Sequence, residues 1–139
     1  MSLRLILCTL FLATGFLHAA PMKFEASSLK YLYTINLEQK KQSIQGTFKR
    51  SEYGVNEVKF GFEGDLISSQ DGVKKYKITF SSKDLKRNGP PYSMPSKKKI
   101  IWSMVKTRDG SAIKVKMLSK VYLPIPHWKL AEVEFDQGK

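Results

Sequence analysis

The chain has 139 residues, a formal net charge of +12 at pH 7 and a single cysteine, Cys8. One cysteine excludes an intramolecular disulfide and a thiolate-rich metal site. The excess of lysine and arginine predicts anionic partners such as lipid headgroups, acidic polymers or acidic proteins.

The first nineteen residues have the organisation of an export signal. Arg4 supplies a basic start, residues 5–17 are almost wholly apolar, and a small residue, Ala19, follows. The apolar run is shorter than the roughly 20 residues that a membrane-spanning helix needs. We therefore expect a signal peptide over residues 1–19, and one β-rich domain over residues 20–139 in the periplasm or outside the cell. The absence of cysteine and of an Asn-x-Ser/Thr acceptor after Ala19 favours a bacterial origin.

Apolar and polar residues alternate through the first half of this domain, which predicts strands. One strand carries Leu29, Tyr31, Tyr33, Ile35 and Leu37 on one face. Phe24 and Ala26 are out of phase with that face, so Ser27-Ser28 is expected to form a bulge or a bend. Two more strands flank a turn at residues 51–54, and their apolar faces hold Ile44, Gly46 and Phe48, then Val58, Phe60, Phe62, Gly64 and Leu66.

The second half of the chain contains two tight-turn signals, Asp71-Gly72 and Asp109-Gly110, which favour β-hairpins. The apolar faces around them hold Tyr76, Ile78 and Phe80, then Ile113, Val115, Met117, Val121 and Leu123. The opposite faces hold Lys75, Lys77, Lys114, Lys116 and Lys120, which predicts a basic outer wall. This wall either docks an anion or only maintains solubility.

The last segment, residues 128–135, has an ambiguous pattern. Trp128 and Leu130 share one phase, whereas Val133 and Phe135 share the other, so a strand here would need a bulge. A short helix would place Trp128 and Phe135 together. We favour the strand.

Seven or eight strands in sequence order predict an all-β antiparallel meander that closes into a small barrel or folds into a sandwich. Gly46, Gly61 and Gly64 favour a strongly coiled sheet, as in a barrel. The strands of an outer-membrane barrel also alternate, but its interior would have to hold these lysines with few carboxylates to pair with them.

The long connection over residues 81–96 and the strand after it form the strongest candidate site. Cations interleaved with aromatic rings suit the charged head and the apolar part of an anionic amphiphile, or a nucleic-acid strand. The candidate ligand-binding residues are Lys83, Lys86, Arg87, Tyr92, Lys97, Lys98, Lys99 and Trp102. The alternative is a solvated loop whose lysines keep a sheet edge from pairing.

The other reactive side chains favour structural roles. His127 lies between Pro126 and Trp128 without a nearby serine and carboxylate pattern, which indicates packing at a strand end. Two same-face carboxylate pairs are more simply explained as surface charges that balance a basic sheet; they are Glu63 with Asp65, and Glu132 with Glu134. We expect no catalytic residue, no metal site and no cofactor.

Three functional classes remain. The first is an exported, non-enzymatic carrier that binds a lipid or fatty-acid-like anion, with its tail in the apolar interior and its head at a basic rim. Eight large rings either fill that interior or line a cavity; they are Tyr31, Tyr33, Phe48, Phe60, Phe62, Tyr76, Phe80 and Trp102. The second is a cell-envelope protein that docks by charge onto an acidic partner or a membrane surface. The third, an enzyme, is disfavoured, and we expect no nucleic-acid partner; the oligomeric state is left open.

Overall fold

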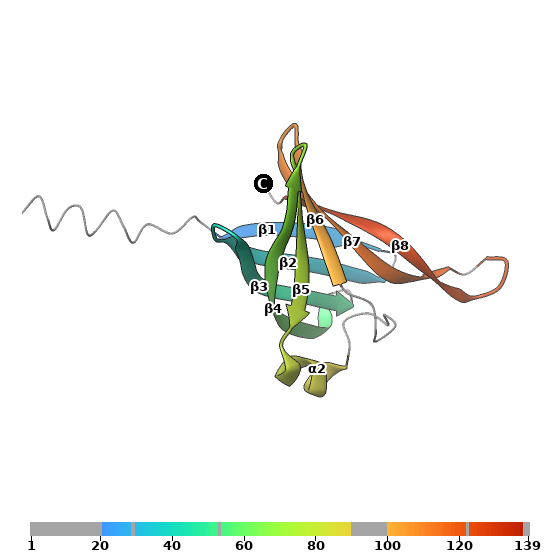
Figure 1. Cartoon of the computed structure of the whole chain (residues 1–139). Coiled ribbons are helices and arrows are strands. Elements are labelled where there is room, and N and C mark those ends of the chain that lie inside the picture. Colours follow the sequence, from blue (N-terminus) through green and yellow to red (C-terminus); the bar gives the residue numbers. More distant parts are fainter. Residues whose placement is uncertain (1–20, 29, 53, 90–99, 122, 138–139) are drawn as a thin grey trace, which may run out of the picture.

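The structure is a computed structural model that describes residues 21–28, 30–52, 54–89, 100–121 and 123–137. In this part of the chain, eight antiparallel strands follow one another and close into a barrel (Figure 1). This confirms the predicted meander and selects the barrel over the sandwich. In chain order the elements are β1 (Met22–Ser27), β2 (Tyr31–Gln39), β3 (Ser43–Glu52), β4 (Val55–Gln70), β5 (Val73–Phe80), α2 (Ser82–Asn88), β6 (Ile100–Thr107), β7 (Gly110–Val121) and β8 (His127–Gln137).

The alternation of side chains sorts the barrel into an apolar inside and a charged outside. On β5, Tyr76, Ile78 and Phe80 are buried, whereas Lys75, Lys77 and Thr79, which alternate with them, are exposed. Successive side chains of the other strands also point to opposite faces, although Thr34 with Ile35 on β2 and Ala112 with Ile113 on β7 are buried as neighbours. The buried set forms one core cluster.

Each strand pairs with its sequence neighbour, and the ring closes where β1 meets β8. Only two residue pairs join these two strands among the described residues, Phe24 with Gln137 and Glu25 with Asp136. By contrast, β2 pairs with β3 over its whole length, from Tyr31 with Glu52 to Gln39 with Ile44. The β1–β8 seam is therefore the narrowest junction of the described sheet. No helix among the described residues has the length and apolar content needed to cross a membrane.

Ser27-Ser28 leads into a chain reversal, where a bulge or bend was expected. The backbone N–H of Ser28 donates to the carbonyl of Tyr31 at 2.8 Å, and the Ser28 hydroxyl accepts from the Tyr31 N–H at 3.2 Å. The reversal explains why Phe24 is out of phase with Ile35, because the two residues now lie on separate strands. They face each other across β1 and β2, and both are fully buried.

The last segment is a strand, β8, as favoured, but the expected bulge is wrong. Its register with β7 is continuous from Ala112 with Asp136 to Val121 with His127. Leu130 and Phe135 have opposite phases because they lie on opposite faces of β8. Phe135 is buried, whereas Leu130 is 42% exposed on the outer face. An apolar residue is tolerated outside because isolated surface apolar groups carry little penalty.

The helix α2 was missed within the long connection. Ser81 caps its N-terminus, because the Ser81 hydroxyl accepts from the Asp84 N–H at 3.4 Å. Gly89 ends it at a positive φ of 71°, and its N–H donates to the Leu85 carbonyl at 3.0 Å. Ser81, Asp84 and Gly89 are the residue types that start and stop helices, so the signal was present in the sequence.

This helix covers the part of β4 that β5 does not reach. The pairing of β4 with β5 stops at Phe62 with Phe80. Just beyond, the Gly61 N–H donates to the Asp84 carboxylate at 2.8 Å, and the Ser81 N–H donates to the Gly61 carbonyl at 2.8 Å. The Asn88 amide donates to the Lys59 carbonyl at 3.2 Å. Groups of the α2 segment thus take the place of a strand and protect an open sheet edge.

We expect Asp84→Ala to lower the free energy of unfolding by about 1–3 kcal/mol, because it leaves the part-buried Gly61 N–H without its acceptor. Urea denaturation measures the change. Asp84→Asn keeps an acceptor oxygen and should lose less, and Lys83→Ala alters only an exposed neighbour. Equal losses in Asp84→Ala and Lys83→Ala would contradict this role of the carboxylate.

Candidate functional site

The predicted basic loop is only partly within the described residues. Lys83, Lys86 and Arg87 are exposed on α2. The remaining cations and the tyrosine of that prediction, Tyr92, Lys97, Lys98 and Lys99, lie outside the described residues. Whether they join the α2 cations in one anion site therefore stays a prediction.

Trp102 lies in the core and not beside these surface cations. Its side chain is 1% exposed, and its ring packs edge-on against Phe62 at 4.8 Å and near Phe80 at 6.0 Å between centroids. Its indole N–H has no hydrogen-bond partner among the described residues. The structure thus separates Trp102 from the three exposed cations of α2.

Aromatic rings occupy the middle of the barrel. Phe48 is fully buried, and its ring centroid lies 6.0–6.4 Å from the rings of Tyr33, Phe60, Phe80, Trp102 and Phe135. Such tilted and edge-to-face contacts are favourable for aromatic pairs. Two hollows lie away from this aromatic centre, one on the outer wall and one at the end of the barrel.

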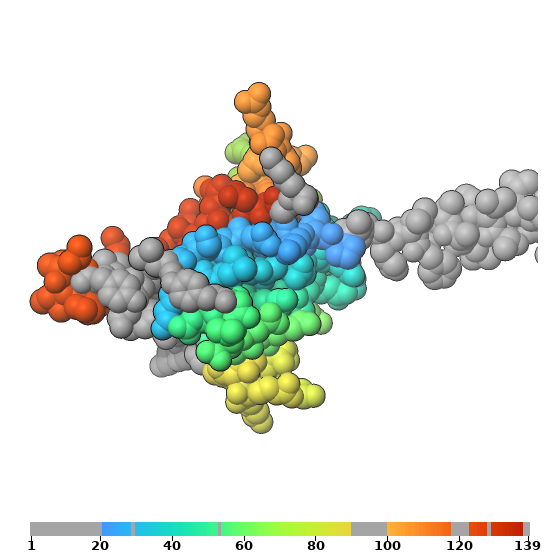
Figure 2. All heavy atoms as spheres, turned by 180° about the vertical axis from the view of Figure 1, so that it is seen from behind, coloured from blue at the N-terminus to red at the C-terminus, as the bar shows by residue number. Residues whose placement is uncertain are grey.

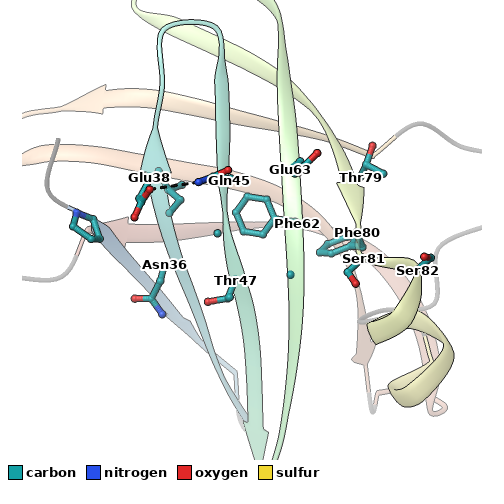
Figure 3. Close-up of a pocket in the computed structure, with 14 residues that line it drawn as sticks. Asn36, Glu38, Gln45, Thr47, Phe62, Glu63, Thr79, Phe80, Ser81 and Ser82 are labelled. Carbon is teal, nitrogen blue, oxygen red and sulfur yellow. Dashed lines mark hydrogen bonds between the residues drawn. The ribbon is translucent and has the colours of Figure 1, made fainter. Parts of the chain in front are cut away.

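The hollow on the outer wall is a broad open groove of about 750 Å³ across β2, β3, β4 and β5 (Figure 3). Pro21, just before β1, and Ser82, at the start of α2, also line it. Two carboxylates line it, Glu38 and Glu63, and Glu38 accepts from the Gln45 amide at 3.5 Å. No lysine, arginine or histidine is among its described lining residues. This groove does not suit an anion.

The hollow at the end of the barrel has the opposite character. It has a volume of about 250 Å³ and is lined by residues of the β4–β5 and β6–β7 hairpins. These hairpins rise at the end of the barrel opposite α2 (Figure 1). We call this hollow the mouth cavity; its lining residues are Gln39, Ser69, Gly72, Lys74, Met104, Val105, Lys106 and Ser111. It combines two cations with hydroxyl and amide groups and the nearly buried thioether of Met104.

Strand register explains why two lysines line this cavity. Lys74 lies two residues before the buried Tyr76 on β5, and Lys106 lies two residues after the buried Met104 on β6. Residues two apart on a strand share a face, so both lysines continue the inward faces of their strands to the end of the barrel. Lys74 also lies directly opposite Met104 across the two strands.

Neither lysine forms an ion pair with a described residue, whereas Lys23, Lys30, Lys49 and Lys114 each pair with a glutamate at 2.9–3.9 Å. The Gln39 amide, which also lines the cavity, donates to the Tyr76 hydroxyl at 3.3 Å. Burial raises the pKa of Tyr76, and this hydrogen bond opposes the rise. The tyrosine is therefore neutral at physiological pH, and the cations dominate the charge of the cavity.

These mouth residues were missed, although the alternation contained the signal. Lys74 shares its phase with Tyr76 and Ile78, unlike the outward Lys75 and Lys77. A lysine that alternates in step with the buried residues of a strand, at the end of that strand, is expected to lie at the rim of the barrel.

The histidine and the carboxylates considered in the sequence analysis have structural roles where the structure describes their contacts. His127 is exposed, and its Nδ1 lies 2.7 Å from the Ile125 carbonyl oxygen. Glu132 pairs with Lys114 at 3.9 Å on the outer wall. Among the described residues, no group of three or more histidine, cysteine or carboxylate side chains could hold a metal ion.

A comparison with known protein families, curated proteins and solved structures found no match to this chain.

Proposed function

We propose that this protein is an exported, non-enzymatic binding domain for a small anionic amphiphile, and that the ligand binds at the mouth cavity. One observation carries the proposal: Lys74 and Lys106 line a cavity of about 250 Å³ with Met104 and have no carboxylate partner among the described residues. An anionic head would compensate both charges, and its first carbons would contact the thioether. The proposed export depends on residues 1–19, which lie outside the described residues.

The volume limits the ligand. Pockets for drug-sized molecules are typically about 300–1,000 Å³, so this cavity encloses only a short apolar segment. Phe48 and the rings around it occupy the centre of the barrel, which disfavours a long tail continuing inward. A fatty-acid-like anion would thus have its head and first methylenes enclosed, and any longer tail would remain outside.

Titration calorimetry with octanoate tests this proposal. We expect the Lys74→Gln/Lys106→Gln double variant to bind octanoate at least about tenfold more weakly, which corresponds to about 1.4 kcal/mol. Lys116→Gln is the matched control, because it removes one exposed lysine of the outer wall. Octanol should bind more weakly than octanoate, since it has no charge. Absence of octanoate binding to the unmodified protein, or an equal effect of the control, would overturn the proposal.

The alternative is electrostatic docking of the outer wall onto an acidic partner. It is supported by the exposed lysines of β5 and β7, Lys75, Lys77 and Lys116. Docking through exposed charges weakens steeply with salt, because the Debye length falls from about 10 Å at 0.1 M to about 3 Å at 1 M. Ligand binding inside the mouth cavity should survive moderate salt, which separates the two functions.

A further inference from the structure

The β7–β8 hairpin extends well past the barrel wall as an arm (Figure 1). The pairing of β7 with β6 ends at Ser103 with Lys114, whereas its pairing with β8 continues to Val121 with His127. Beyond the barrel, the described part of the arm thus has no third strand beside it. A two-stranded ribbon has little stability of its own in water, so a long one that projects is suited to contact a partner.

The end of this arm, residues 123–126, is apolar and exposed. We call it the arm tip; it has the sequence Leu-Pro-Ile-Pro. Leu123 is 81% exposed and Ile125 is 72% exposed, more than any other large apolar side chain of the described residues. Figure 2 shows the tip, in orange-red, standing away from the body of the barrel. An apolar end at the farthest point of a hairpin can enter a partner before the rest of the protein makes contact.

The charges around the tip favour a negatively charged partner. From Val115 to Ala131 the sequence contains three lysines and no aspartate or glutamate. Lys129 is exposed on β8, two residues from the exposed His127. Apolar side chains at the leading end with cations behind them are the arrangement by which peripheral segments bind anionic lipid surfaces.

The prolines argue against a protein partner that adds a strand. Pro124 and Pro126 have no N–H to donate, which disfavours β-augmentation by the tip. A lipid interface needs no such ladder, and it accepts Leu123 and Ile125 without a shaped pocket. We propose that the arm tip inserts into the headgroup region of an anionic lipid bilayer and anchors the barrel to its surface.

Vesicle co-sedimentation tests the proposal with the purified protein. The vesicles contain phosphatidylcholine with phosphatidylglycerol, or phosphatidylcholine alone. We expect binding to the anionic vesicles, and at least about a tenfold lower partition coefficient for Leu123→Ser/Ile125→Ser. The matched control is Val55→Ser/Ile67→Ser, which removes two apolar side chains that are 61% and 50% exposed on β4, and it should bind like the unmodified protein.

Charge is tested with the same vesicles. Lys129→Gln should weaken binding to the anionic vesicles and leave the weaker binding to phosphatidylcholine unchanged. The proposal would be overturned if the tip variant bound as well as the unmodified protein, or if the tip and control variants lost binding equally. A tip that captured a protein partner but ignored both vesicle types would also overturn it.

This inference does not depend on the mouth cavity. The tip variant should still bind octanoate, and the Lys74→Gln/Lys106→Gln variant should still bind vesicles. Failure of one proposal is therefore distinguishable from failure of the other.

Discussion

Replacing Phe48 by alanine should lower the free energy of unfolding by about 3–5 kcal/mol, the usual cost of truncating a buried phenylalanine. Phe48 is fully buried, and rings from five strands surround it. Its removal leaves a cavity whose walls belong to a closed sheet, and a closed sheet cannot collapse freely into the space. Urea denaturation followed by circular dichroism measures the loss.

Ile67→Ala is the control for this substitution. Ile67 lies on the outer face of β4 and is 50% exposed, so its truncation should change the free energy of unfolding by less than about 0.5 kcal/mol. A loss below 1 kcal/mol in the Phe48 variant would mean that the rings do not pack as the structure places them. Phe48→Leu should fall between the two, because it restores part of the volume.

Gly46→Ala should be destabilising by about 3 kcal/mol or more, at the upper end of the cost of overpacking. A Cβ at this position would overlap the Asn36 carbonyl oxygen and lie 2.8 Å from the Leu37 Cα. Both are backbone atoms of β2, so no side chain can turn aside to make room. The substitution must instead push β2 away from β3, which disturbs the register between them.

Gly61→Ala provides a matched comparison on the neighbouring strand. A Cβ there would meet the Asp84 carboxylate at 3.4 Å and the Ser81 Cβ at 3.7 Å, which are ordinary contacts. We expect this variant to change the free energy of unfolding by less than about 1 kcal/mol, since the methyl fits and alanine has the smaller entropy loss on folding. Equal effects at the two positions would contradict the close approach of β2 and β3.

The strands were predictable because each has one apolar face. The alternation of Tyr76, Ile78 and Phe80 with lysines needs only the period of two and a buried side, and the structure has that arrangement. Barrel closure was less accessible, because it depends on how strongly the sheet coils. Gly46 indicated that coil, and the close approach of β2 explains why glycine is needed there.

The site was less predictable than the fold. Cations that cluster in the sequence predicted a site at residues 83–99. The residues that line the mouth cavity instead come from five separate strands. Only the register of those strands brings Gln39, Ser69 and Ser111 beside Lys74 and Lys106. The exposure of Leu123 was also hidden in the sequence, because it follows the same alternation as the buried Val115 and Met117. The alternation of apolar and polar residues does not show where a strand stops pairing within the barrel and continues as part of a projecting hairpin.

The narrow seam between β1 and β8 has a consequence for how the protein is assembled. Every other junction of the sheet joins strands that follow each other along the chain, so those hairpins can form one after another as the polypeptide emerges. Only β1 and β8 are neighbours that lie far apart in the sequence, and until β8 has been synthesised one edge of β1 can pair with a strand of another molecule. Pairing of β1 with a strand of another molecule is therefore most favoured in the interval before β8 closes the barrel.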